Sequence, residues 1–216
     1  MKLLIMAANG QIAKIVEKRI LNETAFKNVE LTLFLRKSSR LSDLADNSRV
    51  KIIEGSLDDK NDVNDAVAGQ DVVFVAVVDH TSNNVWTKNV IEAMKANNVT
   101  RVIFTNILGI YDEVPGEFGR WNRQSVMSGL QAAINSDKLL ADSGLDYTTL
   151  RLPWLNDRNE VKYVVTHKSE PYNGVSGSRQ SIADVVLKIV ADPKFGSKDS
   201  LEIADPATQG SDRPVY

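Results

Sequence analysis

Short apolar runs alternate with longer segments of helical periodicity, and this alternation constrains the fold more than any other feature of the chain. Several runs, such as Asp71–Val77 and Arg101–Thr105, are apolar nearly throughout, which is typical of strands covered on both faces in a parallel sheet. A repeated strand–helix order requires right-handed crossovers, so the sequence predicts a doubly wound, mostly parallel α/β sheet. The expected strands are Lys2–Met6, Val29–Leu35, Val50–Glu54, Asp71–Val77, Arg101–Thr105 and Tyr147–Leu152, and the expected helices are Gln11–Asn22, Asp62–Ala68, Ser82–Asn97 and Trp121–Ser143.

The segment after Leu152 has a different pattern. An acidic and polar stretch leads to the run "VKYVVTH" and a turn at Asn173-Gly174, and these are followed by a helical pattern at Ser181–Ala191 and a last strand at Ser200–Ile203. We therefore expect a single domain over 1–216. Within it, 1–152 form the core sheet and 153–216 form a small C-terminal substrate lobe folded onto that sheet.

Charge and residue content exclude several classes of function. The chain has 26 Lys+Arg against 28 Asp+Glu, so it lacks the basic surplus that general nucleic-acid binding requires. It has no cysteine and only His80 and His167 as histidines, and we expect neither a disulfide nor a metal site. No apolar run approaches the ~18 residues of a membrane span, so we expect a cytoplasmic protein that contacts neither membrane nor nucleic acid directly.

The loop "MAANGQIAK" follows the first expected strand and opens the first expected helix. A strand–turn–helix of this kind presents unpaired backbone N–H groups and the positive end of the helix dipole to a diphosphate. Ala7, Gly10 and Ala13 stand where a G-x-x-G-x-x-G pattern has its glycines. We expect Gly10 to leave room for phosphate and Ala7 to adopt a negative φ. The alternative is a plain connection with Asn9-Gly10 as its corner.

Basic residues follow the second expected strand, which ends in "LFLRKSSR". An acid at this position would bind the ribose 2′-hydroxyl of NAD, whereas Arg36, with Lys37 and Arg40 nearby, suits the 2′-phosphate of NADP. A solvated basic loop is the alternative interpretation. After the third strand, Ser56, Leu57 and Asp58 would lie beside the adenine.

Six motifs in this order resemble the atypical short-chain dehydrogenases/reductases of the NmrA-like, NAD(P)H-binding group. They are "AANGQIAK", "EGSLDD", "VVFVAVVDH", "RVIFTNILGIYDEVPG", "SGLDYTTLRLPWL" and "SRQSIADVV". The resemblance implies a Rossmann-type sheet, a bound NADP(H) or NAD(H), and a substrate cleft closed by the C-terminal lobe. The expected cofactor-binding residues are Ala7, Asn9, Gly10, Gln11, Ile12, Arg36, Lys37, Ser56, Leu57, Val77 and Thr105.

The proton donor is not evident from the sequence. The Tyr-x-x-x-Lys pair of related reductases is absent, because Tyr147 is followed four residues later by Arg151, which cannot act as the same tunable group. His80 follows the fourth strand and either donates a proton or is an ordinary loop histidine. Asn106, like Thr105, stands where it can hydrogen-bond a substrate carbonyl. Tyr111 either reaches over the nicotinamide or packs beneath the loop.

The leading hypothesis is an NADP(H)-preferring oxidoreductase that transfers hydride to a small carbonyl, quinone or flavin-like acceptor. The alternative is a redox-sensing regulatory protein without turnover, which the missing Tyr-x-x-x-Lys pair favours. A sugar epimerase or dehydratase fits less well, because the C-terminal lobe is short. The expected partners are a small-molecule substrate and either a second copy of the chain or a regulatory protein.

Overall fold

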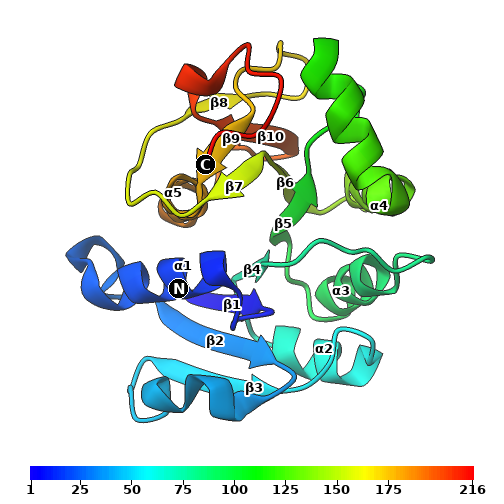
Figure 1. The fold of residues 1–216 in the computed structure, drawn as a ribbon. Coiled ribbons are helices and arrows are strands. Elements are labelled where there is room, and N and C mark those ends of the chain that lie inside the picture. Colours follow the sequence, from blue (N-terminus) through cyan, green and yellow to red (C-terminus); the bar gives the residue numbers. More distant parts are fainter.

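The computed structural model describes all residues, 1–216, and it has an eight-stranded central sheet (Figure 1). The strand order is β3-β2-β1-β4-β5-β6-β10-β8, and every neighbouring pair is parallel except β10 and β8. The order reverses between β1 and β4, as in doubly wound sheets. The strands are β1 (Lys2–Met6), β2 (Glu30–Leu35), β3 (Val50–Glu54), β4 (Val72–Val75), β5 (Arg101–Ile107), β6 (Asp146–Leu152), β8 (Val164–Thr166) and β10 (Asp199–Ala204).

Helices cover both faces of the sheet. Figure 1 shows α1 and α5 on one side and α2, α3 and α4 on the other. Alternate residues of β1 supply the two faces: Leu3 and Ile5 join the core beneath α1 and α5, and Leu4 and Met6 join the core beneath α2 and α3. Both faces are therefore apolar, as the continuous apolar runs predicted. The helices are α1 (Gln11–Asn22), α2 (Lys60–Val67), α3 (Val85–Ala96), α4 (Gly116–Asp142) and α5 (Arg179–Ala191).

The six strands and four helices expected in 1–152 are confirmed. The bounds of β1, β3 and α1 are as expected, and the other elements have shifted ends. The run 71–77 is a strand only to Val75, because the chain then turns into the loop before α3. Helix α4 begins at Gly116, five residues before the expected start, and its first turn contributes the buried Phe118, which stacks near Trp121 and Tyr172.

The C-terminal segment extends the central sheet. Strand β10 pairs in parallel with β6, and β8 forms the antiparallel edge. The expected last strand, 200–203, therefore lies within the sheet rather than on top of it. Two further strands, β7 (Trp154–Asn156) and β9 (Ser176–Ser178), form a separate two-stranded sheet. The Ser178 hydroxyl accepts from the Ser181 N–H and caps α5.

One face of β6 and β10 carries buried polar residues instead of apolar ones. Thr149 lies opposite Ser200, and Arg151 lies opposite Glu202. Arg151 pairs with Glu113, and Asp137 of α4 accepts a hydrogen bond from Tyr111. We call this set the polar layer: Glu113, Asp137, Thr149, Arg151, Ser200 and Glu202, with the adjacent Tyr111 and Tyr172.

Candidate functional site: a cavity at the carboxyl ends of β1 to β4

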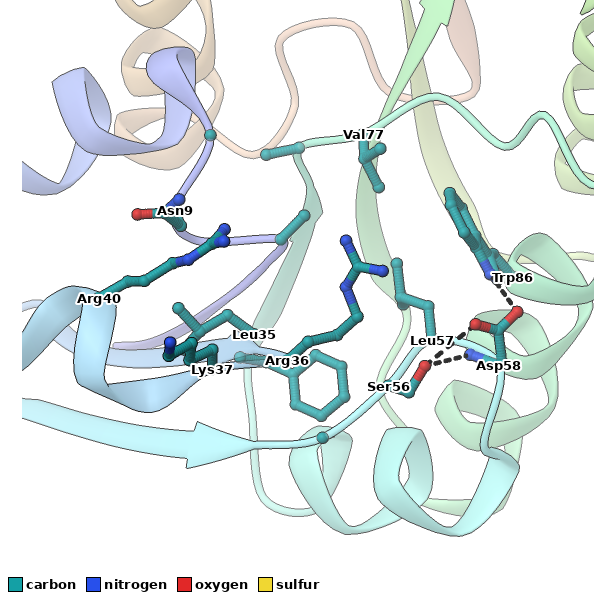
Figure 2. A pocket seen from close by; sticks show the side chains of 15 residues that line it. Asn9, Leu35, Arg36, Lys37, Arg40, Ser56, Leu57, Asp58, Val77 and Trp86 are labelled. Carbon is teal, nitrogen blue, oxygen red and sulfur yellow. Dashed lines mark hydrogen bonds between the residues drawn. The ribbon is translucent and has the colours of Figure 1, made fainter.

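A cavity of about 540 Å³ opens at the carboxyl ends of β1 to β4, where the strand order reverses. Ligands bind at this position in open α/β sheets. Figure 2 shows its two ends: Asn9, Lys37 and Arg40 gather on one side, and Asp58 and Trp86 on the other, with the Arg36 side chain between them. The cavity is lined by Ala7, Asn9, Gly10, Phe34, Leu35, Arg36, Lys37, Arg40, Gly55, Ser56, Leu57, Asp58, Ala76, Val77 and Trp86.

The turn between β1 and α1 forms the rear of the cavity. The Gly10 N–H donates to the Ala7 carbonyl (3.0 Å), and Gly10 is the residue that precedes α1. No side chain caps α1, and its first turn contains no acid. The positive end of the helix is therefore not offset by the chain itself. A Cβ at Gly10 would lie 3.3 Å from the Ala7 carbonyl oxygen, so the turn is tight even before a ligand enters.

The backbone of Ala7 differs from the sequence-based expectation. Its φ is +59°, in the left-handed region, and not negative as expected. The chain reverses at this residue within the tight turn that the Gly10 N–H closes onto the Ala7 carbonyl. Ala7 therefore takes the conformation for which a glycine is usual and bears its cost.

We predict that Ala7→Gly stabilises the fold. Relief of the left-handed strain is worth ~1–2 kcal/mol, and the greater freedom of glycine in the unfolded chain offsets ~0.4–1 kcal/mol of this. The expected net gain is therefore about 0.5–1 kcal/mol in the free energy of unfolding, measured by urea denaturation. Ala13→Gly is the matched control, because Ala13 lies inside α1 and is fully buried, and it should lose ~1 kcal/mol or more. If Ala7→Gly also lowered the free energy of unfolding, the result would contradict the interpretation that Ala7 is strained.

Three cations lie together at the tip of β2. Arg36, Lys37 and Arg40 all line the cavity, and none of their side chains makes a hydrogen bond or an ion pair with the rest of the chain. The nearby acid Glu54 instead accepts from the Ser38 hydroxyl (2.6 Å) and the Ser38 N–H (2.8 Å), and these bonds lower the pKa of Glu54. The charge of Lys37 also lowers the pKa of Glu54, so that acid offsets part of the charge of Lys37, whereas Arg36 and Arg40 have no acid beside them. This end of the cavity therefore has a positive charge suited to a phosphate.

The opposite end of the cavity is formed by the loop after β3. The Trp86 indole N–H donates to Asp58 Oδ1 (2.8 Å), and the Ser56 hydroxyl donates to Asp58 Oδ2 (3.1 Å). Trp86 comes from α3, twenty-eight residues further along the chain, and sequence reasoning missed it. A tryptophan at the start of a helix has no local signal for a cavity, and only the crossover from β4 to α3 brings it there.

Several expected cofactor residues do not line the cavity. Gln11 is exposed, and Ile12 packs at the edge of the core beneath α1; only their backbone N–H groups belong to the helix end. The Thr105 hydroxyl is buried and donates to the Val75 carbonyl (2.8 Å), so it joins β5 to β4 instead of facing a ligand. The expected residues that the fold does bring together are Ala7, Asn9, Gly10, Arg36, Lys37, Ser56, Leu57 and Val77.

Two of the three expected catalytic side chains are engaged elsewhere. Asn106 is 1% exposed, donates to the Ala133 carbonyl (2.9 Å) and accepts from the Ile107 N–H (2.8 Å). The Tyr111 phenol donates to Asp137 in the polar layer (2.6 Å), and burial and this hydrogen bond raise its pKa well above the usual range. Tyr111 therefore packs beneath the loop. This is the second of the two roles that the sequence allowed for it. Asn106 in β5 and Tyr111 in the β5–α4 loop are therefore both absent from the lining of the cavity.

His80 remains exposed and forms no hydrogen bond with the chain. Its ring lies against α4 at Gly129, where a Cβ would come within 2.8 Å of the imidazole Nδ1. The neighbouring Asp79 is fully buried and accepts from the Thr87 N–H and hydroxyl, which anchors the start of α3. The residue before His80 is thus fixed to α3, and His80 itself is not among the residues that line the cavity.

A switch-point cavity with an uncapped helix end and free cations at the tip of β2 defines a dinucleotide-binding protein of the Rossmann type. The match to known proteins agrees with this class. Residues 7–193 match the NAD(P)H-binding family, and the chain belongs to that family.

Solved structures share the fold over the whole chain. A short-chain dehydrogenase/reductase from Veillonella parvula in complex with NADP is 27% identical, with a TM-score of 0.91, and the match covers 100% of this chain and 99% of that one. A Rossmann-fold NAD(P)-binding family protein from Shigella flexneri is also 27% identical, with a TM-score of 0.79 and coverage of 100% and 98%. An anaerobillin reductase from Escherichia coli has the same fold at 15% identity, with a TM-score of 0.79 and full coverage of both chains. No curated protein matches the sequence.

The expected relationship to the short-chain dehydrogenases/reductases is thereby confirmed, as is the Rossmann-type sheet. No helix is long and apolar enough to cross a membrane.

Proposed function

We propose that this protein is an NADP(H)-preferring oxidoreductase that passes hydride to a small carbonyl, quinone or flavin-like acceptor. The observation that carries the preference is the cluster of Arg36, Lys37 and Arg40, which lines the cavity and forms no ion pair with an acid of the chain. A carboxylate at the same place would repel a 2′-phosphate. The Veillonella parvula relative, which is in complex with NADP, supports the same choice.

The residues present fit a dinucleotide phosphate. The N–H groups at the start of α1 would hold the diphosphate, and Gly10 leaves the space in front of them open. Arg36, Lys37 and Arg40 would hold the 2′-phosphate, where a guanidinium can form two parallel hydrogen bonds. The bound cofactor supplies the hydride chemistry, and the protein supplies orientation and a defined pocket.

The proton donor we favour is His80 or water. His80 is exposed and without a hydrogen-bond partner in the chain, and it lies beside α4 rather than in the lining of the cavity. Tyr111 and Asn106, by contrast, are engaged in hydrogen bonds with other parts of the chain. An imidazole can pass a proton to an acceptor oxygen. Oxidation of NADPH with a panel of quinones and aldehydes tests turnover, and no oxidation above background with any of them would count against an enzyme.

Arg36→Asp tests the cofactor preference. We expect the parent protein to bind NADPH more tightly than NADH and the variant to lose about 10- to 100-fold in NADPH affinity, because it loses a charge-assisted bond and gains a repulsion. NADH affinity should change little. Titration of both nucleotides against intrinsic fluorescence measures the two dissociation constants.

The control for charge alone is Lys27→Asp, which makes the same change in net charge at an exposed position outside the cavity. It should leave both affinities unchanged. Equal affinity of the parent for NADPH and NADH would show that the cations after β2 do not bind the 2′-phosphate.

A redox-sensing regulatory protein without turnover is the second candidate. It is favoured by the engagement of Tyr111 with Asp137 and by the absence of a Tyr-x-x-x-Lys pair. A sensor must bind oxidised and reduced cofactor with different affinities and must bind a partner, a regulatory protein or a second copy of the chain, in one state only. Equal affinities for NADP⁺ and NADPH, with no partner in either state, would remove this candidate.

A further inference from the structure

We propose that Gly129 is a positioning residue for His80. The absence of a Cβ at this position of α4 gives the imidazole its place on the helix and directs its Nε2 atom away from the helix. The proposal rests on the proposed function, because it takes His80 as the group that passes a proton to the acceptor. The contact itself lies within the chain and can be tested without a cofactor.

The His80 ring occupies the space in front of Gly129. A Cβ built on this glycine would lie 2.8 Å from Nδ1, 3.3 Å from Cε1 and 3.9 Å from Cγ of the ring, and these are its three nearest atoms. A Cβ contact under 3.0 Å is not tolerated, so any residue with a Cβ would displace the ring. Nδ1 and its two ring neighbours face the helix, and Nε2 therefore points away from it.

The backbone does not require a glycine at this position. Gly129 lies in the interior of α4, and its φ is not positive, unlike that of Gly116 at the start of the same helix. Every residue can adopt this helical conformation, and glycine is the least favourable choice there after proline. Because the nearest atoms are all of His80, accommodation of the ring accounts for the glycine.

The segment that carries His80 lies along one face of α4. The Asn84 side-chain amide donates to the Ala132 carbonyl (2.8 Å), and the Thr87 hydroxyl shares a hydrogen bond with the Ser136 hydroxyl (2.8 Å). These two partners follow the glycine by three and seven residues, so all three lie on one helical face. Polar contacts therefore hold the segment on α4, whereas the His80 ring, which forms no hydrogen bond, is placed by shape alone.

This position suits proton transfer at the end of β4. Val77 lines the cavity and His80 follows it by three residues, so their Cα atoms are at most about 11 Å apart. Nε2 is the nitrogen that an acceptor can reach, because Nδ1 faces the helix. The acceptor oxygen takes a proton from Nε2, which balances the hydride that the acceptor receives. The exposed ring then takes a proton back from water.

Gly129→Ala should change stability and turnover in opposite directions. Alanine favours the helix and the exposed ring can move aside, so the melting temperature should rise by roughly 2–4 °C. We expect kcat for NADPH oxidation to fall about tenfold or more, because the ring is misplaced, and KM for NADPH to change less than about twofold. His80→Gln should lose about 100-fold in kcat, and Gly129→Ala should cause no further loss in that variant.

The imidazole signals in the NMR spectrum give a readout that needs neither cofactor nor turnover. The chain has two histidines, and His167→Gln assigns their signals. Gly129→Ala should shift the His80 signals and leave those of His167 in place. Ser128→Ala is the matched control, because it also favours the helix but at the neighbouring exposed position. It should change neither the His80 signals nor kcat.

The outcomes separate this inference from the proposed function. Unshifted His80 signals in Gly129→Ala overturn the positioning role and leave the oxidoreductase intact, as does a parent kcat in that variant while His80→Gln is impaired. Parent turnover in His80→Gln also overturns this inference and leaves water as the proton donor. A parent protein that oxidises no NADPH overturns the oxidoreductase and this inference together.

A second variant covers the case in which Gly129→Ala does not fold. His80→Ala removes the ring from the space in front of the glycine, so Gly129→Ala should fold in that background. Folding of the double variant alone supports the contact. Failure of both variants to fold shows that other neighbours require the glycine and overturns the positioning role.

Discussion

Arg151→Met is expected to lower the free energy of unfolding by about 3–5 kcal/mol, the range for breaking a buried ion pair from one side. Arg151 is 1% exposed, pairs with Glu113 Oε1 (2.9 Å) and donates to the Ser200 (3.2 Å) and His167 (3.3 Å) carbonyls. Methionine fills the space, but it removes the cationic partner of Glu113, which then keeps only the backbone N–H donors of Gly109 and Tyr111. It also removes one donor from each of the two carbonyls. Urea denaturation measures the loss.

Two further variants separate charge from packing. Arg151→Met combined with Glu113→Gln removes the uncompensated carboxylate, so part of the loss should return. Arg123→Met breaks the exposed pair with Asp112 and should cost under about 1 kcal/mol. If Arg151→Met does not fold, Arg151→Lys reports on the same site, because it keeps the charge and loses the forked geometry. A cost for Arg151→Met as small as that for Arg123→Met would contradict a structural role of the pair.

Glu202→Gln should make the protein more stable at pH 8 and change little at pH 5. Burial raises the pKa of Glu202 from its ordinary 4.5 to about 7, against the hydrogen bond from Thr166 and the charge of Arg151. Because the folded-state pKa is raised, the stability linked to the bound proton is fully present below pH 4.5 and is lost as the pH rises to about 7. Glutamine needs no proton, so the gain over the parent grows through this window to on the order of 2–3 kcal/mol.

Two other glutamates of the chain provide comparison variants for Glu202→Gln. Burial also raises the pKa of Glu17 in α1, to about 8, so the gain from Glu17→Gln should continue to a higher pH. Glu92→Gln replaces an exposed glutamate and should show no gain that depends on pH. A Glu202→Gln gain that is the same at pH 5 and pH 8 would show that Glu202 keeps its ordinary pKa in the fold.

The sheet was largely predictable from local pattern. Strands β1, β2, β4 and β5 appear as short, largely apolar runs, because a strand covered on both faces needs apolar residues on both. Strand β6 was recognised although one of its faces contributes Thr149 and Arg151 to the polar layer. The order of strands and helices then leaves few topologies, since crossovers are right-handed. Strand β10 was recognised as a strand, but its pairing with β6 depends on contacts between segments about fifty residues apart.

The candidate site was predictable on one side of the cavity. Asn9, Gly10, Arg36 and Lys37 stand directly after β1 and β2, so the rule that ligands bind at strand ends was enough to select them. The left-handed backbone of Ala7 was not predictable, because its φ is set by the turn that closes onto Gly10. The contribution of Trp86 depends on where α3 packs against the loop after β3.

Residue types near a strand end indicate what chemistry is available, but they do not say which side chains are already satisfied. Tyr111, Asn106 and Thr105 all carry groups suited to a substrate, and each forms a hydrogen bond with a segment distant in the sequence. His80, Arg36 and Asp58 remain available, because the packing around them leaves acceptors or donors free. Periodicity is a property of neighbours along the chain, and it determines the elements. Hydrogen-bond satisfaction is a property of neighbours in space, so it emerges only when the chain has folded.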